Sequence, residues 1–130
     1  SSRYIYFDTE FDNKYVYFDE NQEFISLYPY WEVDDDYTKL SVNVSFDLKS
    51  YTENKLPVLI FTVGDFYQGV PLVSLQNESL NTGELEHFMK RINISKGKSY
   101  KGEKLKIYLW NKTDDRMMFD NVNVLIKASK

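Results

Sequence analysis

The sequence predicts an all-β fold in which about eight or nine short strands form an antiparallel sandwich or barrel. Apolar and polar residues alternate strictly from Leu40 to Leu48, short apolar runs recur along the whole chain, and alanine occurs only once. Tyr, Phe, Val and Ile dominate these runs, and such residues favour strands over helices. A strand with this alternation presents one face to a core and the other to water.

Four strands are expected in the first part of the chain, over residues 4–7, 15–18, 23–27 and 40–48. Aromatic and β-branched residues fill these runs. Asp12-Asn13 and Asp34-Asp35-Asp36 supply turns between them, because Asp and Asn tolerate turn conformations. The run 40–48 has the clearest period of two, which predicts a half-buried strand.

Five further strands are expected over residues 58–63, 69–75, 85–94, 104–111 and 117–127. The last two are joined by a short polar segment, so we expect them to pair as a hairpin that closes the fold. The turns between the strands are short and contain no repeat. The length of 130 residues suits one core, and residues 1–130 are therefore expected to form a single β-sandwich domain.

Composition and motifs exclude several classes of function. The chain has no cysteine, so it has no disulfide framework, thiol nucleophile or zinc ribbon. His87 is the only histidine, and neither a nucleophile elbow nor a phosphate-binding loop is present, so we expect an ordinary strand histidine and a protein that is not an enzyme. No run of about 18 apolar residues occurs, and no membrane span is expected in this segment.

The net charge of −4 is unevenly distributed along the chain. Residues 1–36 carry ten acidic and two basic side chains, whereas residues 90–130 carry eleven basic and four acidic ones. Either the first and last strands are neighbours that neutralise each other, or the basic region meets an anionic partner. Nucleic acid is not an expected partner, because the lysines are dispersed and the domain is net acidic.

Aromatic side chains are concentrated near the beginning, where twelve of the 22 lie in the first 37 positions. A core cannot take every ring of a run whose neighbours alternate between faces, so some rings are expected to be exposed. Exposed rings offer flat apolar platforms, and we predict a carbohydrate site at Tyr28, Tyr30, Trp31 and Tyr67. The acids of residues 34–36 would accept hydrogen bonds from sugar hydroxyls. In the alternative interpretation, these rings pack the edge of the sandwich.

Five segments, over residues 12–17, 21–26, 37–50, 102–111 and 119–124, follow one another in a characteristic order. In this order they resemble galactose-binding-domain-like jelly rolls and the carbohydrate-binding modules that share this fold, from bacterial (Bacteroidetes-type) exported or membrane proteins. The resemblance covers residues 12–126 and implies an antiparallel jelly-roll sandwich in the periplasm or at the cell surface. The chain begins without an initiator Met or a signal peptide, so we expect it to be a piece of a larger protein.

Members of the resembled group usually open with a strand whose acids help to hold a structural calcium ion, together with an acid near the last strand. The resemblance therefore implies a calcium site with Asp8, Glu10 and Asp120 as carboxylate ligands. Calcium takes several oxygen ligands and tolerates irregular geometry. The run 34–36 is a second candidate cation site, although three adjacent carboxylates more often form a solvated turn.

Three functions are compatible with these observations. The first is a non-catalytic β-sandwich module of an exported or surface protein that binds carbohydrate. The second is a protein-interaction or assembly module, in which the acidic first third and the basic last third contact complementary partners or other domains of the parent protein. The third, and the least favoured, is a hydrolase that uses a pair of carboxylates.

Overall fold

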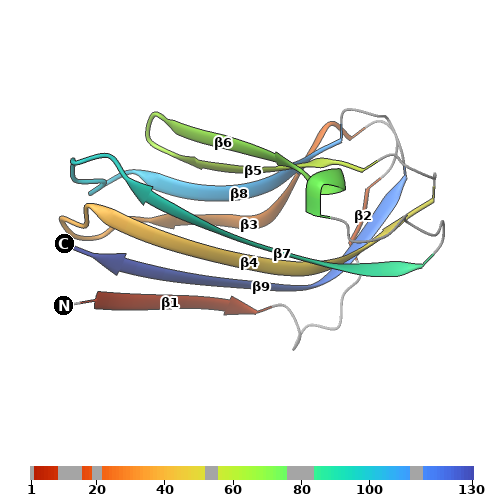
Figure 1. The fold of residues 1–130 in the computed structure, drawn as a ribbon, viewed down its shortest axis with the longest axis horizontal. Helices are drawn as coiled ribbons and strands as arrows, with labels where there is room; N and C mark the ends of the chain where they lie inside the picture. The colour runs from red at the N-terminus through yellow and green to blue at the C-terminus, as the bar shows by residue number, and fades with distance from the viewer. Residues whose placement is uncertain (1, 9–15, 19–21, 52–55, 76–83, 112–115) are drawn as a thin grey trace.

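Two antiparallel β-sheets pack face to face in the computed structural model of the chain (Figure 1). The structure describes residues 2–8, 16–18, 22–51, 56–75, 84–111 and 116–130, with the backbone alone for 16–18. Its strands are β1 (Ser2–Asp8), β2 (Val16–Phe18), β3 (Phe24–Glu32), β4 (Lys39–Ser50), β5 (Val58–Val63), β6 (Phe66–Pro71), β7 (Leu85–Ser95), β8 (Lys104–Trp110) and β9 (Met117–Ser129). The first sheet has the order β1-β9-β4-β7, with β2 also paired to β9, and the second has the order β3-β8-β5-β6.

From β2 to β5 and from β6 to β9 the chain crosses between the two sheets at every connection. β7 and β9 lie in the first sheet, whereas β8, which connects them in sequence, lies in the second. Every strand pairing is antiparallel in the described part of the chain. The predicted all-β antiparallel sandwich of eight or nine strands is therefore confirmed. No helix among the described residues is long and apolar enough to cross a membrane.

Strand β4 supplies the centre of the core. Its alternate side chains are almost wholly buried, namely Leu40, Val42, Val44, Phe46 and Leu48. They form one cluster with the inward side chains of β5 and β8 from the opposite sheet. Burial of each large apolar side chain contributes about 1.5–3 kcal/mol. The predicted half-buried strand is confirmed, and it extends a little beyond both expected ends.

The last two strands do not form the predicted closing hairpin. β8 pairs with β3 and β5, whereas β9 pairs with β1, β2 and β4. A period of two buries one face of a strand whether its neighbour lies beside it in the same sheet or opposite it across the core. Periodicity therefore predicted both strands correctly, and the inferred pairing between them was wrong.

Strand β6 lies earlier in the chain than the expected strand over residues 69–75, and Leu72–Leu75 form a short 3-10 helix. Val63 and Phe66 are register partners, so Gly64 and Asp65 form a two-residue hairpin loop between β5 and β6. Gly64 has a φ of 57°, a conformation that glycine adopts without steric cost. This Gly-Asp pair is the turn signal that locates β6.

Strand β9 contains one extra residue opposite β4. Ser45 pairs with Asn123 and Asp47 pairs with Asp120, so a single residue of β4 faces two residues of β9. Asn121 lies in this β-bulge with a φ of 55°, and its Nδ2 donates a hydrogen bond to Oδ2 of Asp47 at 2.8 Å. Asp47 of the neighbouring strand thus holds the Asn121 side chain, and Nδ2 of Asn123 in β9 itself donates to the Asn121 backbone carbonyl at 3.1 Å.

Candidate functional site

The outer face of the second sheet carries aromatic and polar side chains that lie outside the core. In β8 the leucines and Ile107 are buried, so the alternating residues between them point away from the core. The strand register brings side chains of β3, β5 and β6 beside them. We call this set the aromatic face: Phe24, Ser26 and Tyr30 of β3, Lys106, Tyr108 and Trp110 of β8, Thr62 of β5, and Tyr67 of β6.

Three rings of the aromatic face contact one another. The rings of Phe24 and Trp110 stack, with centroids 6.2 Å apart and an angle of 20° between their planes. Phe24 also makes an edge contact with Tyr108, with centroids 5.7 Å apart. Phe24 is nevertheless 53% exposed. Because the rings hold one another in place, a ligand would meet a preformed apolar surface and would not have to order it.

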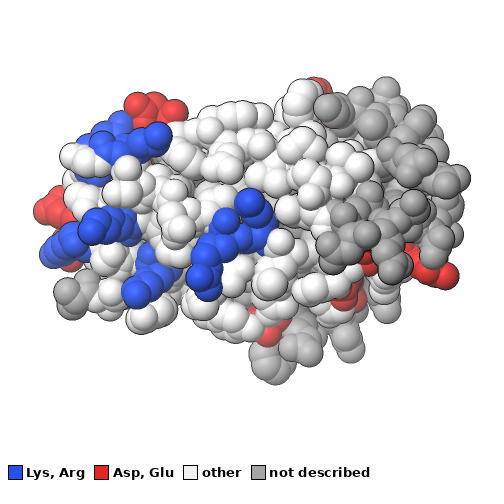
Figure 2. Space-filling model, in the orientation of Figure 1, with Lys and Arg blue, Asp and Glu red and all other residues white. Residues whose placement is uncertain are grey.

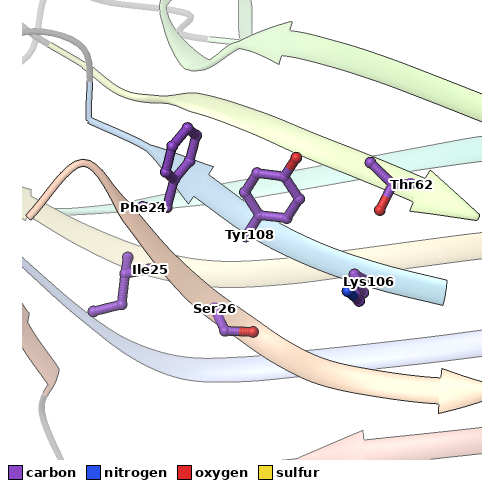
Figure 3. Close-up of a pocket in the computed structure, with 6 residues that line it drawn as sticks. All are labelled: Phe24, Ile25, Ser26, Thr62, Lys106 and Tyr108. Atoms are coloured by element: carbon purple, nitrogen blue, oxygen red, sulfur yellow. The ribbon is translucent and has the colours of Figure 1, made fainter. Parts of the chain in front are cut away.

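A groove of about 420 Å³ lies beside these rings. Figure 3 shows the rings of Phe24 and Tyr108 side by side, with the hydroxyls of Ser26 and Thr62 and the amino group of Lys106 nearby. The groove therefore combines an apolar wall with hydrogen-bonding groups. Its volume is that of an ordinary small-molecule site, which is about 300–1,000 Å³.

Tyr108 and Tyr67 extend the aromatic face toward the edge formed by β6. Burial raises the pKa of Tyr108 above the usual tyrosine range, and the neighbouring Tyr67 raises it further, so the Tyr108 hydroxyl is neutral at pH 7 and can donate a hydrogen bond. Tyr67 is 59% exposed. A Cβ at Gly69 would lie 3.3 Å from a Val58 methyl, which is tight, and 3.5 Å from Oη of Tyr67, which is ordinary contact.

Two of the four predicted platform residues, Tyr30 and Tyr67, lie on the aromatic face. Both are largely exposed, and they come from the two edge strands of the second sheet. The ammonium group of Lys104 lies 4.8 Å from the centroid of the Tyr30 ring. The two rings therefore lie on opposite sides of β8 and its groove.

The other two predicted platform residues, Tyr28 and Trp31, face the core. Tyr28 is 7% exposed, its ring makes an edge contact with Phe7 at 5.1 Å, and burial raises its pKa. Trp31 packs against the core beside Tyr37, with ring centroids 6.4 Å apart. Tyr28 is therefore part of the core, whereas Trp31 is partly buried against it. Two register shifts in β3 break its alternation, which is why spacing alone did not assign these rings to a face.

Sequence reasoning left Phe24, Tyr108 and Trp110 out of the predicted site. A signal was present in β8, where alternation with buried Ile107 and its leucine neighbours requires Tyr108 and Trp110 to share the outer face. Phe24 carried no comparable signal, because its place beside these rings depends on the pairing of β3 with β8.

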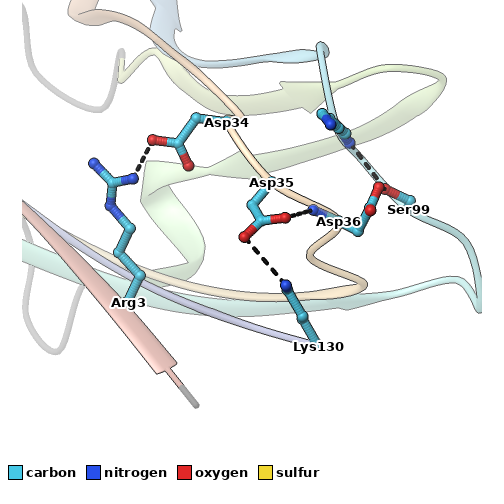
Figure 4. A network of polar contacts seen from close by, with 7 residues as sticks. Arg3, Asp34, Asp35, Asp36, Ser99 and Lys130 are labelled. Carbon is cyan, nitrogen blue, oxygen red and sulfur yellow. Dashed lines mark hydrogen bonds and ion pairs between the residues drawn. The ribbon is translucent and has the colours of Figure 1, made fainter.

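The acidic run at residues 34–36 is engaged by side chains of the chain itself (Figure 4). Asp34 forms an ion pair with Arg3, Nζ of Lys130 lies 3.1 Å from Asp35, and the Ser99 hydroxyl donates to Asp36 at 3.2 Å. The backbone N–H of Asp36, followed by Lys130, lowers the pKa of Asp35. These contacts support the interpretation in which charges from distant parts of the sequence neutralise each other, and they do not form a sugar site with the aromatic face.

Two of the three predicted calcium ligands, Asp8 and Asp120, lie on strands of the first sheet. Asp8 ends β1 and accepts a hydrogen bond from the Tyr6 hydroxyl at 3.1 Å, whereas Asp120 lies at the bulge of β9 opposite Asp47. Glu10 lies outside the described residues. In the described part of the chain, no three His, Cys, Asp or Glu side chains are grouped so that they could hold a metal ion. The calcium site stays a prediction.

His87 lies on β7 with its Nδ1 2.8 Å from Oδ1 of Asp47. The other oxygen of this carboxylate accepts the hydrogen bond from Asn121 at the bulge. Asp47 therefore joins β7 to β9 across β4. The third member of the group is an amide and not a nucleophile, so the arrangement orders the sheet surface and does not form a triad.

Comparisons with known proteins identify a fold and no family. No family model matches the chain, and no curated protein matches it. Among solved structures, the chain is similar to the infectious bursal disease virus VP2 subviral particle, with a TM-score of 0.62 and 13% identity over 98% of this chain and 32% of that one. A structure of the Gx strain of the same virus gives a TM-score of 0.59 and 15% identity, with the same coverage.

A weaker match is dimeric latent PorU from Porphyromonas gingivalis, with a TM-score of 0.44 and 11% identity over 98% of this chain and 10% of that one. The chain spans about a third of the length of the viral proteins. At such low identity the viral likeness shows the β-sandwich fold alone.

Proposed function

We propose that this chain is a non-catalytic β-sandwich module that binds carbohydrate through the aromatic face. The observation that carries the proposal is the groove of about 420 Å³ beside the mutually packed rings of Phe24, Tyr108 and Trp110. The C–H face of a sugar ring packs on such aromatic surfaces, while its hydroxyls need hydrogen-bond partners. Ser26, Thr62 and the other polar lining groups supply those partners.

Binding without catalysis fits the groups in this groove. Glycoside hydrolysis ordinarily requires two carboxyl groups about 5–10 Å apart. Among the described residues, those that line the groove include hydroxyls and the ammonium group of Lys106 but no carboxylate. We therefore expect the ligand to be held and released unchanged.

The wider setting of the proposal follows from the sequence resemblance. Galactose-binding-like jelly rolls and related carbohydrate-binding modules are commonly parts of larger exported proteins. We expect this chain to act in the same way, outside the cytoplasm, by holding a parent protein against a polysaccharide.

Affinity electrophoresis and calorimetry with neutral polysaccharides test the proposal. We expect Tyr108→Ala and Phe24→Ala each to weaken binding about tenfold or more, since stacked aromatic contacts of this kind contribute about 1–3 kcal/mol. Tyr6→Ala is the matched control, because Tyr6 is 63% exposed and lies on the other sheet. If no neutral glycan binds, or if the control weakens binding as much as the two test variants, the assignment of the aromatic face is wrong.

An assembly role is the second candidate, and edge strand β7 supports it. Leu85 and Met89 on this strand are exposed, and β7 has a free side in the first sheet. Exposed apolar residues along a free edge favour pairing with another chain. Light scattering distinguishes the two candidates: an assembly module forms oligomers that Met89→Lys disperses, whereas a sugar-binding module stays monomeric in both forms.

A further inference from the structure

The outer face of the first sheet differs in character from the aromatic face. Its register aligns Tyr4, Lys127, Ser41 and Asn93 in one row across four strands, and Tyr6, Leu125, Asn43 and Arg91 in the next row. We call the polar part of these two rows the cationic face: Ser41, Asn43, Arg91, Asn93 and Lys127, with Tyr4 at its edge. All of these side chains are partly or fully exposed.

The cationic face is hollowed. Tyr4, Leu125 and the five polar residues line a groove of about 390 Å³. A second groove of about 230 Å³ adjoins it, because both share Ser41, Asn93 and Lys127. Lys39 lines the second groove and adds a third positive charge. The two hollows together span several rows of the sheet.

The positive charges of this face are not neutralised by the described part of the chain. Other basic side chains form ion pairs there: Arg3 pairs with Asp34, Lys98 with Asp65 and Lys130 with Asp35. Arg91 and Lys127 have no such carboxylate partner among the described residues. Lys127 instead lies 6.0 Å from the centroid of the Tyr4 ring, which holds its ammonium group over the groove without reducing its charge.

The carboxylates on the strands of the first sheet lie at its far end, whereas Asp34 and Asp35 near the chain termini are paired with Arg3 and Lys130. Asp47 and Asp120 are at the bulge, and Asp8 is at the other end of β1 from Tyr4. On the face drawn in Figure 2, Lys and Arg atoms gather over the half of the molecule at which both termini lie in Figure 1. An anion approaching the cationic face therefore meets a locally positive surface although the chain is net acidic.

The spacing of the two cations suits one charged sugar. Arg91 on β7 and Lys127 on β9 flank β4, so their backbones are about 10 Å apart across the sheet and are offset by two residues along it. Both side chains line the same groove as Ser41 and Asn43. Asn43, Asn93 and Ser41 make no side-chain hydrogen bond to another described residue, so their amide and hydroxyl groups are available to a ligand.

We propose that the cationic face binds a sugar that carries an oxyanion, either a carboxylate or a sulfate. Arg91 and Lys127 hold the oxyanion, since guanidinium and ammonium groups form charge-assisted hydrogen bonds to such groups. Asn43 and Asn93 hydrogen-bond the hydroxyls, and the Tyr4 ring packs on the sugar face. The site lies on the opposite sheet from the aromatic face and does not depend on it.

Retardation in gels that contain a polysaccharide tests the proposal on the 130-residue chain. The probes are polygalacturonate, which carries carboxylates, dextran sulfate, which carries sulfates, neutral dextran, and polyacrylate, which is a polyanion without sugar. We expect one or both charged polysaccharides to bind at least tenfold more tightly than dextran and polyacrylate. The charged polysaccharide that binds shows whether the oxyanion is a carboxylate or a sulfate.

Point variants then locate the site. Arg91→Ala and Lys127→Ala are each expected to weaken binding about tenfold, and Tyr4→Ala to weaken it severalfold. Lys101→Ala is the charge-matched control, because Lys101 is exposed in the turn before β8 and lines neither groove. Tyr108→Ala on the aromatic face should leave this binding unchanged. All five changes are at exposed or partly exposed positions, and thermal unfolding verifies that each variant is folded.

Four results would overturn the proposal. The first is that neither charged polysaccharide binds. The second is that polyacrylate binds as tightly as they do, which would indicate simple ion exchange. The third is that Lys101→Ala weakens binding as much as Arg91→Ala. The fourth is that Tyr108→Ala alone loses binding. The charged ligand would then bind at the aromatic face, and the proposed site on the cationic face would be wrong.

Discussion

Asn121 lies in the bulge of β9 with a backbone φ of 55°. Residues other than glycine, asparagine and aspartate rarely adopt this left-handed conformation. Its side chain also donates the 2.8 Å hydrogen bond to the carboxylate of Asp47. Two separate effects therefore stabilise this position, and two substitutions separate them. Asn121→Ala removes the hydrogen bond and leaves a Cβ in a strained backbone, whereas Asn121→Gly removes the hydrogen bond and relieves the strain.

The expected magnitudes follow from these two effects. A hydrogen bond to a partly buried carboxylate contributes about 1–1.5 kcal/mol, and an alanine in the left-handed region costs about 1 kcal/mol. Asn121→Ala should then lower the free energy of unfolding by about 2–2.5 kcal/mol and Asn121→Gly by about 1–1.5 kcal/mol. For a domain of this size, about 1 kcal/mol corresponds to a shift in Tm of about 4 °C.

Urea unfolding followed by circular dichroism measures both differences, with thermal melting as a second readout. Asn93→Ala is the control, because Asn93 is an exposed asparagine in the regular part of β7 and its side chain makes no hydrogen bond to another described residue. Equal destabilisation by Asn121→Ala and Asn121→Gly would refute the role assigned to the backbone conformation. Losses below about 0.5 kcal/mol in both would refute the hydrogen bond to Asp47 as well.

Three further variants test the core and the charge pairs. Tyr100 is buried and its hydroxyl has no hydrogen-bond partner among the described residues, so Tyr100→Phe should raise the free energy of unfolding by about 1 kcal/mol in urea titrations. Phe46 is wholly buried against Phe88, and Phe46→Ala should lower it by about 3–5 kcal/mol in the same assay. The pKa of Asp35 is lower in the folded chain, so its contribution to stability is present above the ordinary aspartate pKa and is lost as the pH falls below it. Asp35→Asn should therefore flatten the pH dependence of unfolding below about pH 4.

Each of these three predictions has a clear contrary result. A destabilised Tyr100→Phe protein would mean that the hydroxyl is hydrogen-bonded. A loss below about 1 kcal/mol in Phe46→Ala would mean that the centre of the sandwich repacks around the missing ring. An unchanged acid profile in Asp35→Asn would assign the acid sensitivity to other carboxylates, and Asp65→Asn is the next variant to measure, because the pKa of Asp65 is lowered by Lys98.

The local sequence pattern was sufficient to predict strands such as β4 and β5. Alternation between Leu40 and Leu48 predicted β4, and a run bounded by turn residues predicted β5 with the bounds that the structure shows. Both signals depend on neighbouring residues only. Where the pattern is interrupted, as in the bulged strand β3, alternation could not assign Tyr28 and Trp31 to a face, and both pack against the core.

The residues that share a face across different strands could not be predicted in the same way. The aromatic face combines Phe24 from β3 with Tyr108 from β8 and Tyr67 from β6, and the cationic face combines Arg91 from β7 with Lys127 from β9. These residues are far apart in sequence. Their proximity is a consequence of strand order, which no short-range spacing encodes.

The amino-acid sequence by itself determined that the protein is an all-β sandwich, because a period of two and the abundance of aromatic and β-branched residues leave few other ways to bury its apolar side chains. Only the tertiary structure decided that β8 and β9 belong to different sheets and that two separate outer faces result. The physical reason is that alternation of apolar and polar residues shows which side of a strand is buried. Hydrogen-bond pairing between distant strands decides which side chains of neighbouring strands lie beside the exposed ones.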